Sequence, residues 1–302
     1  MKVLLTYPQS FVGFSLKRIL SPYVEIITGT VDYLDYQLTN NFLKDVSPDL
    51  VILNVPFCGG ITLNINKPAE LMLKNMVVQT NVIASSLQCG VKRLIFIGSS
   101  CMYPKTFEHP LKERDLLQGP LEETNSAYST AKLAGWQMCN AYSKQYGVFY
   151  KTIIPANLFG PKDDFDENAH VVSALISRFH ECKIKNEPTI SIWGSGTPVR
   201  DFLFIDDFAR AILFLLQNNS DAQEINVGSG LGFSISEIAN AIKNATQYKG
   251  KTIFDTSKPD GMKVKVLDTS RINNLRWKPS DSLEKGIQNT YDGDMEFINN
   301  KK

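Results

Sequence analysis

Residues 94–104 read LIFIGSSCMYP. The first four residues form a continuous apolar run, which is typical of a strand buried on both faces inside a parallel sheet. Ser99, Ser100 and Cys101 follow Gly98 directly. Because open parallel sheets bind their ligands beyond the carboxyl ends of the strands, we expect these side chains to open onto a ligand-binding cleft.

Strands and helices alternate on both sides of this stretch. We predict strands at residues 2–6, 24–27, 50–53, 91–97 and 149–154, and helices at residues 10–20, 68–90 and 126–146. This alternation predicts an α/β fold with a doubly wound, Rossmann-like parallel sheet.

The pattern becomes less regular after Gly160, with helices predicted at 171–182 and 234–246 among short strands at 189–192, 202–204, 224–227 and 252–254. We therefore expect two unequal domains. Residues 1–160 would bind a dinucleotide, and residues 161–302 would form a smaller substrate domain. A segment near 201–219 would pack back on the first domain.

The composition limits the classes of function. The chain has 302 residues, of which 43% are hydrophobic and 21% are charged, and its net charge is +1. Disorder is excluded as the main state, and a nucleic-acid or membrane-surface binder would normally be more basic. No apolar run is long enough to cross a bilayer, and Pro8 interrupts the N-terminal run, so we expect no signal peptide and a cytoplasmic protein.

The five cysteines form no C-x-x-C pair, and none of the three histidines stands at metal-ligand spacing from another. This pattern favours reduced thiols and no metal site. An intracellular enzyme or a small-molecule binder remains.

Tyr128 and Lys132 stand four residues apart and therefore on one face of a predicted helix. A lysine ammonium lowers the pKa of a neighbouring tyrosine, which can then exchange a proton with a carbonyl oxygen while hydride reaches the carbon. Ser99, at the strand end, can hold the same oxygen. An isolated Y-x-x-x-K is more often an exposed helical pair, but the strand-end serine favours the catalytic interpretation.

The sequence resembles the extended short-chain dehydrogenase/reductase family, and within it the GDP-L-fucose synthase branch of 3,5-epimerase/4-reductases acting on GDP-4-keto-6-deoxy-mannose. The resemblance covers nearly the whole chain. It rests on GGI at 59–61, SSCMYP at 99–104, PLKERDLLQGPLEETNSAYSTAK at 110–132, NLFGP at 157–161, WGSGTPVRDFLFIDD at 193–207, INVGSG at 225–230 and KPDG at 258–261.

The resemblance implies that Ser99, Tyr128 and Lys132 form the reductase triad, and that Cys101 and His170 are the base and the acid of epimerisation. A 4-keto group acidifies the hydrogens at C3 and C5, and inversion removes a proton from one face and returns one to the other. Without the resemblance, a buried thiol and a surface histidine would describe Cys101 and His170 equally well.

The resemblance also implies binding sites for NADP and for a GDP-linked keto-sugar. The implied cofactor residues are Ser10, Gly13, Ile97, Gly98, Ser99, Ser100, Lys132, Pro155, Asn157, Leu158 and His170, and the implied substrate residues are Arg178, Trp193, Arg200 and Asp260. Arginine suits a pyrophosphate because its fork is bidentate and always charged, and tryptophan offers an apolar plate. Outside the family, Arg178 could be an ordinary polar helix residue and Trp193 a core residue.

The first strand-to-helix turn departs from the family pattern G-x-x-G-x-x-G, because residues 7–13 read YPQSFVG. Only Gly13 remains, which allows close packing of helix on strand. A tyrosine adopts a positive φ only at a cost, and Pro8 favours an extended Tyr7 and removes one donor. Ser10 places a side chain where a phosphate would lie, although its hydroxyl could replace a donor.

Charged residues expected around NADP are also missing. The family's arginines correspond to Gln9 and Val31, and its Ala-Ala end of the third strand is replaced by residues 54–56, Asn-Val-Pro. Losing two charged hydrogen bonds, each worth about 1.5–3 kcal/mol, weakens binding by roughly a hundredfold or more. We expect NADP with weakened binding and leave NAD open.

Three functions remain, in this order: an NADPH-linked epimerase/reductase of a GDP-4-keto-sugar (a deoxyhexose or a heptose), an epimerase without hydride turnover, and a non-catalytic nucleotide-sugar-binding or partner protein. We also expect a homodimer, because the family usually dimerises through the two long helices. Burial against the sheet would explain their apolar residues equally well: Leu71, Met72, Ala134, Met138 and Ala141.

Overall fold

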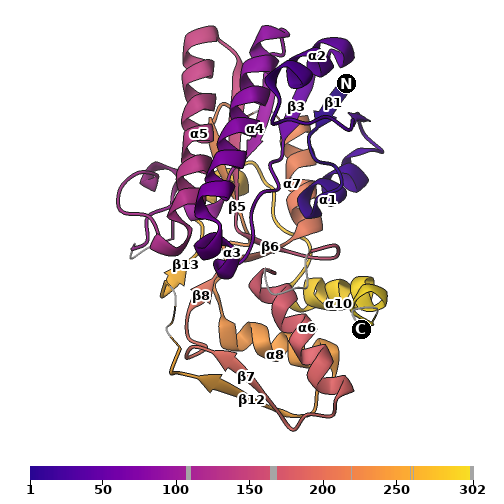
Figure 1. The fold of residues 1–302 in the computed structure, drawn as a ribbon, viewed down its shortest axis with the longest axis vertical. Coiled ribbons are helices and arrows are strands. Elements are labelled where there is room, and N and C mark those ends of the chain that lie inside the picture. The colour runs from indigo at the N-terminus through magenta and orange to yellow at the C-terminus, as the bar shows by residue number, and fades with distance from the viewer. Residues whose placement is uncertain (107–109, 164–168, 219, 259, 261, 300–302) are drawn as a thin grey trace.

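A computed structural model describes residues 1–106, 110–163, 169–218, 220–258, 260 and 262–299 (Figure 1). Two residues of the KPDG motif, Pro259 and Gly261, lie outside this part of the chain.

A six-stranded sheet forms the centre of the molecule, with the strand order β10-β5-β4-β3-β1-β2. Its strands are β1 (Lys2–Leu5), β2 (Glu25–Ile27), β3 (Leu50–Leu53), β4 (Arg93–Ile97), β5 (Phe149–Pro155) and β10 (Glu224–Val227). Every neighbouring pair is parallel. The predicted doubly wound parallel sheet is therefore confirmed.

Helices cover both faces of this sheet. They are α1 (Phe11–Leu20), α2 (Tyr36–Val46), α4 (Pro68–Gln88), α5 (Ser126–Tyr146) and α7 (Ile205–Gln217). On one face α4 packs between α2 and α5, and on the other α1 packs against α7 (Figure 1). Alternate strand residues serve the two cores: Leu94 and Phe96 join the first, whereas Ile95 and Ile97 join the second.

The lower part of Figure 1 is built from shorter pieces. Its paired strands are β7 (Thr189–Trp193) with β12 (Lys251–Asp255), β8 (Val199–Arg200) with β11 (Phe233–Ser234) and β13 (Val264–Lys265), and β6 (Asn157–Phe159) with β9 (Phe202–Phe204). The helices α6 (Val171–Ile184), α8 (Ile235–Thr246) and α10 (Leu283–Asn299) pack on one another.

The chain passes between the two parts several times, so a single domain boundary at residue 160 does not separate them. The helix α7 packs against α1, and β10 is the edge strand of the main sheet although it lies within residues 161–302. Sequence patterns detect a strand but not its sheet, because pairing in a parallel sheet is non-local.

Short elements complete the path: α3 (Ile61–Asn66), α9 (Ser270–Asn274), and the 3-10 turns η1 (Ser100–Met102), η2 (Glu113–Asp115) and η3 (Glu123–Asn125). Within the described ranges, no helix is both long and apolar enough to span a membrane. The same ranges contain no group of three or more His, Cys, Asp or Glu side chains placed to hold a metal ion.

Candidate active site

The turn that follows β4 places Ser99 and Cys101 beyond the sheet. The Ser99 hydroxyl caps η1 by accepting the Cys101 N–H at 3.1 Å. Both side chains are half-buried, whereas Ser100 is buried. Gly98 keeps the turn close to β5, since a Cβ there would lie 3.2 Å from Thr152 Cγ2. Ser99 and Cys101 therefore keep part of their surface accessible after the carboxyl end of β4, whereas Ser100 does not.

Two side chains donate hydrogen bonds to the sulfur of Cys101. Lys265 Nζ and Asn125 Nδ2 each lie 3.4 Å from Sγ. Burial would raise the pKa of this thiol, but the Lys265 ammonium, hydrogen bonds with Ser99 and Lys265, and His170 outweigh it and leave the pKa below the usual value. A thiol with a lowered pKa is suited to act as a base.

Lys132 is buried on α5 beneath the end of β4. Its Nζ donates to the Ile97 carbonyl at 3.0 Å and lies 5.8 Å from the centre of the Tyr128 ring. Burial lowers the pKa of Lys132 to about 8. The pair thus lies on one face of α5, as predicted from its spacing.

The prediction that Lys132 lowers the pKa of Tyr128 was wrong. Burial, followed by the thiols of Cys58 and Cys101, raises that pKa well above the usual value, and a hydrogen bond with Ser99 opposes this only in part. The physical reason is burial of the phenol, which no charge of Lys132 offsets; the Lys132 ammonium donates to the Ile97 carbonyl. Tyr128 is consequently protonated at neutral pH, which is the form that donates a proton.

His170 immediately precedes α6, and a buried carboxylate holds it. Its Nδ1 lies 3.2 Å from Asp163 Oδ1, while the Ser173 hydroxyl donates to Asp163 Oδ2 at 2.6 Å. Burial would lower the pKa of His170, but hydrogen bonds to Asp163 and Cys58 and the charges of both raise it well above its usual value. The imidazole is therefore charged at neutral pH and suited to act as an acid.

The five side chains assigned to catalysis from the sequence lie close enough to influence one another. The charge of Cys101 raises the pKa of Tyr128, and the charge of His170 lowers the pKa of Cys101. Sequence reasoning missed four supporting residues: Cys58, Asn125, Asp163 and Lys265. Each stands inside or within a few residues of a quoted motif, so these residues could have been found by inspecting the positions next to the motifs.

The substrate candidates occupy different surroundings. Trp193 is 70% exposed at the end of β7, with Lys258 Nζ 5.6 Å from its ring, so it is not a core residue. Asp260 accepts the N–H and the hydroxyl of Ser195 at 2.8 and 2.6 Å, and so fixes the turn after β7.

The two arginines assigned to the substrate also make contacts within the chain. Arg178, on α6, donates to the carbonyl of Ser191. Arg200, on β8, donates to the Met262 carbonyl at 2.6 Å, and the charge of Cys101 acts on it. Arg200 is therefore the substrate candidate that the structure ties to the catalytic cluster.

Three cofactor candidates from the family lie at the ends of β5 and β6. Pro155 is the last residue of β5, and Asn157 and Leu158 lie in β6. The Asn157 side chain donates to the Asp201 carbonyl at 2.9 Å and so helps to join β6 to β9.

The turn between β1 and α1 keeps its tight geometry without its first glycine. The expectation that Tyr7 would be extended was wrong, because it lies in the left-handed region with φ 48°. Its ring packs against Tyr33 and Phe57, with centroid distances of 5.2 and 5.6 Å. These contacts offset a backbone cost of about 1–2 kcal/mol. A Cβ on Gly13 would lie 2.1 Å from the Tyr7 carbonyl oxygen, so Gly13 permits the close approach expected of it.

The Ser10 hydroxyl is engaged within the chain. It donates to the Tyr7 carbonyl at 2.9 Å and accepts from Gly13 N and Asn54 Nδ2 at 3.2 and 2.8 Å. It therefore caps α1 and has no proton left to offer a phosphate.

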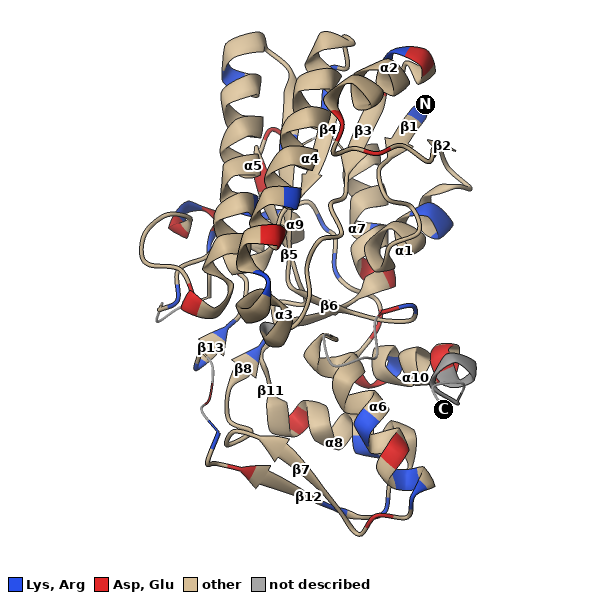
Figure 2. Cartoon of the chain, in the orientation of Figure 1, with Lys and Arg blue, Asp and Glu red and all other residues tan. Residues whose placement is uncertain are grey.

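A dinucleotide phosphate nevertheless finds donors at this helix end. The N–H groups of Phe11 and Val12 have no acceptor among the described residues. A helix N-terminus with outward N–H groups suits an anion, so the turn fits a phosphate with a reduced set of donors. Figure 2 shows that the β1–α1 connection carries no Lys or Arg, whereas β8 and β13 both carry basic residues.

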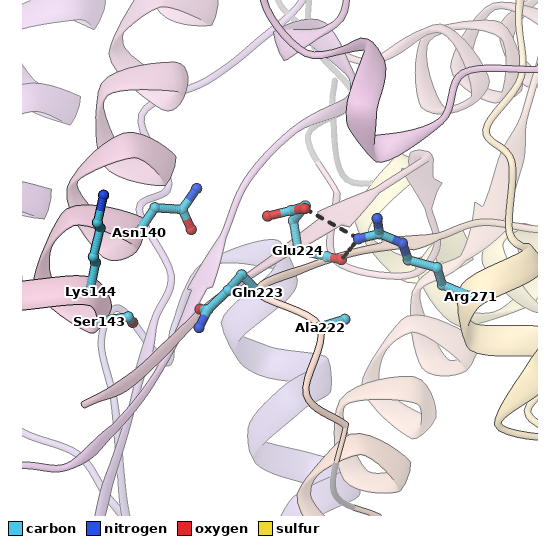
Figure 3. Close-up of a pocket in the computed structure, with 7 residues that line it drawn as sticks. All are labelled: Asn140, Ser143, Lys144, Ala222, Gln223, Glu224 and Arg271. Atoms are coloured by element: carbon cyan, nitrogen blue, oxygen red, sulfur yellow. Dashed lines mark hydrogen bonds and ion pairs between the residues drawn. The ribbon is translucent and has the colours of Figure 1, made fainter. Parts of the chain in front are cut away.

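A pocket of about 540 Å³ lies apart from this cluster (Figure 3). It is lined by α5 residues including Asn140 and Lys144, by Glu224 at the start of β10, and by Arg271, which pairs with Glu224 at 3.2 Å. The strands β10 and β4 both run parallel to β5. The start of β10 therefore lies at the amino ends of the strands, whereas Ser99 follows the carboxyl end of β4.

Comparisons with known proteins agree with this geometry. Residues 14–228 match the NAD dependent epimerase/dehydratase family. The GDP-L-fucose synthase of Sinorhizobium fredii is 43% identical, over 97% of this chain and 94% of that protein. A GDP-6-OMe-4-keto-L-xylo-heptose reductase from C. jejuni superposes with a TM-score of 0.90 at 30% identity, over 98% of both chains. The NADP-bound GDP-mannoheptose C4 reductase from Campylobacter jejuni gives a TM-score of 0.88 at 31% identity, over 97% of both chains.

Proposed function

This chain belongs to the NAD dependent epimerase/dehydratase family, and we propose that it is an NADPH-linked epimerase/reductase of a GDP-4-keto-sugar. The names of its relatives support this class of substrate, since they include GDP-L-fucose synthase and reductases of GDP-linked heptoses.

One observation carries the proposal: a base and an acid whose pKa values are shifted in opposite directions lie in one site. The surroundings of Cys101 lower its pKa, and those of His170 raise its pKa. Groups whose environments separate their pKa values in this way are suited to paired acid–base work. In our proposal Cys101 removes the proton next to the 4-keto group, and His170 returns one to the opposite face.

The reductive half uses residues of β4 and α5. Ser99 holds the C4 oxygen, and Tyr128, protonated at neutral pH, donates a proton to it. When bound, the nicotinamide supplies hydride to C4. Lys132 lies beside Tyr128, where the family resemblance assigns it to the nicotinamide ribose.

We propose that the cofactor binds with fewer phosphate contacts than a complete glycine turn provides. Supporting this, Ser10 is engaged within the chain, and the positions expected to carry arginine are Gln9 and Val31. We expect weakened NADPH binding and only modest discrimination against NADH. Michaelis constants for the two cofactors, measured side by side, test this expectation.

Residues 1–160 would hold the cofactor and residues 161–302 the nucleotide-sugar, with Arg178, Trp193, Arg200 and Asp260 in contact with it. We propose that the enzyme is cytoplasmic, and the five free thiols support a reducing compartment.

We propose a homodimer through α4 and α5, which lie side by side (Figure 1). Leu71 is buried within its own fold, but Met72, Ala134 and Met138 are half-buried and Leu73 is 63% exposed. Light scattering tests the proposal: wild type should run as a dimer, and Leu73→Glu should raise the fraction of monomer.

The function is tested with GDP-4-keto-6-deoxy-mannose and related GDP-keto-heptoses. NADPH oxidation with inversion at C3 or C5 of the product supports the proposal. Deuterium exchange at C3 or C5 without NADPH oxidation would indicate an epimerase alone. Binding by calorimetry without exchange or oxidation would indicate a non-catalytic binder.

A further inference from the structure

The side chain of Asn125 links the sulfur of Cys101 to the helix that carries Tyr128. Asn125 ends η3 and directly precedes α5, and its N–H donates to the Glu122 carbonyl at 3.2 Å. Asparagine in this position usually caps the helix by accepting a hydrogen bond from an N–H of the first turn. Among the described residues, the Asn125 side chain makes no such bond to α5. Its amide is engaged elsewhere.

Two contacts fix the direction of this amide. Ser129, buried one turn further along α5, donates its hydroxyl to Asn125 Oδ1 at 3.1 Å. On the other side, Asn125 Nδ2 donates to Cys101 Sγ at 3.4 Å. An amide oxygen only accepts and an amide nitrogen only donates, so a rotated amide would place an acceptor against a thiolate, which has no proton to give. The Ser129 hydroxyl thus keeps the donor of Asn125 on the side of the sulfur.

The contact from Asn125 differs in kind from the one made by Lys265. Lys265 Nζ also lies 3.4 Å from Cys101 Sγ, but it brings a positive charge at the end of a long, flexible side chain. The amide is neutral, its side chain is short, and Ser129 holds its oxygen. Asn125 therefore fixes where the sulfur lies, whereas Lys265 chiefly supplies charge.

We propose that Ser129 and Asn125 are positioning residues for the base of epimerisation: the Ser129 hydroxyl orients the Asn125 amide, and the amide holds the sulfur of Cys101 toward the substrate proton. Ser129 follows Tyr128 directly, so the first turns of α5 carry both the proton donor for reduction and the support of the base. The inference rests on the proposed function, because the step that it serves is removal of the proton next to the 4-keto group. A base displaced from that proton removes it more slowly.

Charged and titratable groups also act on the Cys101 thiol from several segments. They are Lys265 in β13, His170 directly before α6, Arg200 in β8 and Tyr128 in α5. Replacing Asn125 by a residue of similar size leaves all of them in place, so a change at the thiol reports the loss of the amide contact.

The test uses the full chain with Asn125→Leu, which keeps the size and removes the hydrogen bonds, Asn125→Asp, which replaces the donor by a carboxylate oxygen, and Ser129→Ala. Ser126→Ala is the matched control, because the exposed Ser126 hydroxyl donates to the Glu123 carbonyl in the same turn at 3.3 Å. The rate of Cys101 alkylation by iodoacetamide is measured against pH by peptide mass spectrometry. Urea unfolding verifies that each variant is folded.

We expect the midpoint of the alkylation profile to rise by about one pH unit in Asn125→Leu, which makes the reaction roughly tenfold slower at pH 7 and corresponds to the loss of one hydrogen bond to an ionised group. Asn125→Asp should raise the midpoint further, since a carboxylate repels the thiolate. Ser129→Ala should raise it less, and Ser126→Ala should leave it unchanged. Because Ser129 acts through Asn125, the double variant Asn125→Leu/Ser129→Ala should match Asn125→Leu alone.

The second measurement is deuterium exchange at C3 and C5 of GDP-4-keto-6-deoxy-mannose between pH 6 and 9. We expect Asn125→Leu to slow exchange about tenfold at pH 7 and to move its acid limb to higher pH, in step with the alkylation profile. An unchanged alkylation profile in both Asn125 variants overturns the inference, as does unchanged exchange despite a shifted profile. Additive effects of Asn125→Leu and Ser129→Ala overturn the role of Ser129. If wild type neither exchanges nor oxidises NADPH, the proposed function fails, and the alkylation profiles alone decide whether the amide holds the sulfur.

Discussion

Lys265 donates a hydrogen bond to Cys101, with 3.4 Å between Nζ and Sγ, although 164 positions separate them in the sequence. The ammonium lies on β13 and the thiol in η1, so the contact joins the smaller sheets to the end of the main sheet. Lys265 is buried, and it is the residue that most strongly opposes the effect of burial on the Cys101 thiol.

Lys265→Met should leave less of Cys101 in the thiolate form that acts as the base. Without the ammonium, burial raises the pKa of the thiol, so less thiolate is present at pH 7. We expect alkylation of Cys101 by iodoacetamide to slow about tenfold or more, with its pH profile moving to higher pH. Peptide mass spectrometry measures the rate, and Lys263→Met, at an exposed neighbouring position, is the control. Equal rates in wild type and Lys265→Met would contradict the assignment.

Tyr128→Phe should separate the two half-reactions. The substitution removes the proton donor for the C4 oxygen but leaves Cys101 and His170 unchanged. We expect NADPH oxidation to fall roughly 10²–10⁴-fold, while deuterium exchange at C3 or C5 continues. Because the pKa of Tyr128 lies well above its usual value, wild-type reduction should show no loss from its ionisation up to about pH 10.

The matched control for that variant is Tyr142→Phe on the same helix, where the ring packs against Tyr146 and Tyr150. It should reduce the substrate at the wild-type rate. Loss of exchange together with reduction in Tyr128→Phe would show that the two half-reactions share this residue.

Lys132→Met should stabilise the fold at neutral pH while abolishing reduction. Burial lowers the pKa of Lys132 from 10.5 to about 8, so between these values the unfolded chain binds a proton that the folded chain does not. The contribution of Lys132 to the free energy of unfolding therefore rises with pH across this window and is lowest below pH 8. Removing the buried charge should raise the free energy of unfolding at pH 7 by on the order of 2 kcal/mol.

Urea titrations at pH 7 and pH 10.5 measure this difference. The gain should shrink at the higher pH, where the lysine is neutral in the folded chain and only half protonated in the unfolded chain. A variant that is less stable than wild type at pH 7 would show that the hydrogen bond to Ile97 outweighs the cost of the buried charge.

The main sheet was predictable because each of its strands is a local apolar run. The helix α5 was placed correctly at both ends, since Gly147 adopts the left-handed conformation, with φ 65°, that stops it. The helix α2 was missed although Leu38 and Phe42 stand at helical spacing; only Thr39 and Leu43 of its residues are buried. The helix α10 was also missed, although Leu283, Ile287 and Tyr291 are buried and recur at the four-residue spacing of a helix.

The site divides in the same way. Motifs identified Ser99, Cys101 and Tyr128, because the spacing of these residues within the chain follows from local structure. They did not identify Cys58 or Lys265 as neighbours of the reacting groups, since those contacts depend on how separate loops meet. Nor did residue type alone predict the direction in which the pKa of Tyr128 shifts, which is set mainly by burial.

Ser10→Gly should strengthen cofactor binding at a small cost in stability. The substitution frees the N–H of Gly13 from the Ser10 hydroxyl and adds it to those of Phe11 and Val12. One added hydrogen bond is worth about 0.5–1.5 kcal/mol, so the Kd for NADPH should fall roughly two- to tenfold. The unfolding free energy should drop by about 1 kcal/mol, because a glycine cap costs a few tenths and Asn54 loses a partner.

Fluorescence titration with NADPH and urea denaturation measure the two effects, and Ser21→Gly at the other end of α1 is the control. Weaker NADPH binding in Ser10→Gly would reverse the assignment. It would mean that the Ser10 hydroxyl turns from the Tyr7 carbonyl to the phosphate when the cofactor binds, as the family resemblance implied. The direction of the change in Kd therefore decides whether Ser10 is a cap of α1 or a ligand of the cofactor.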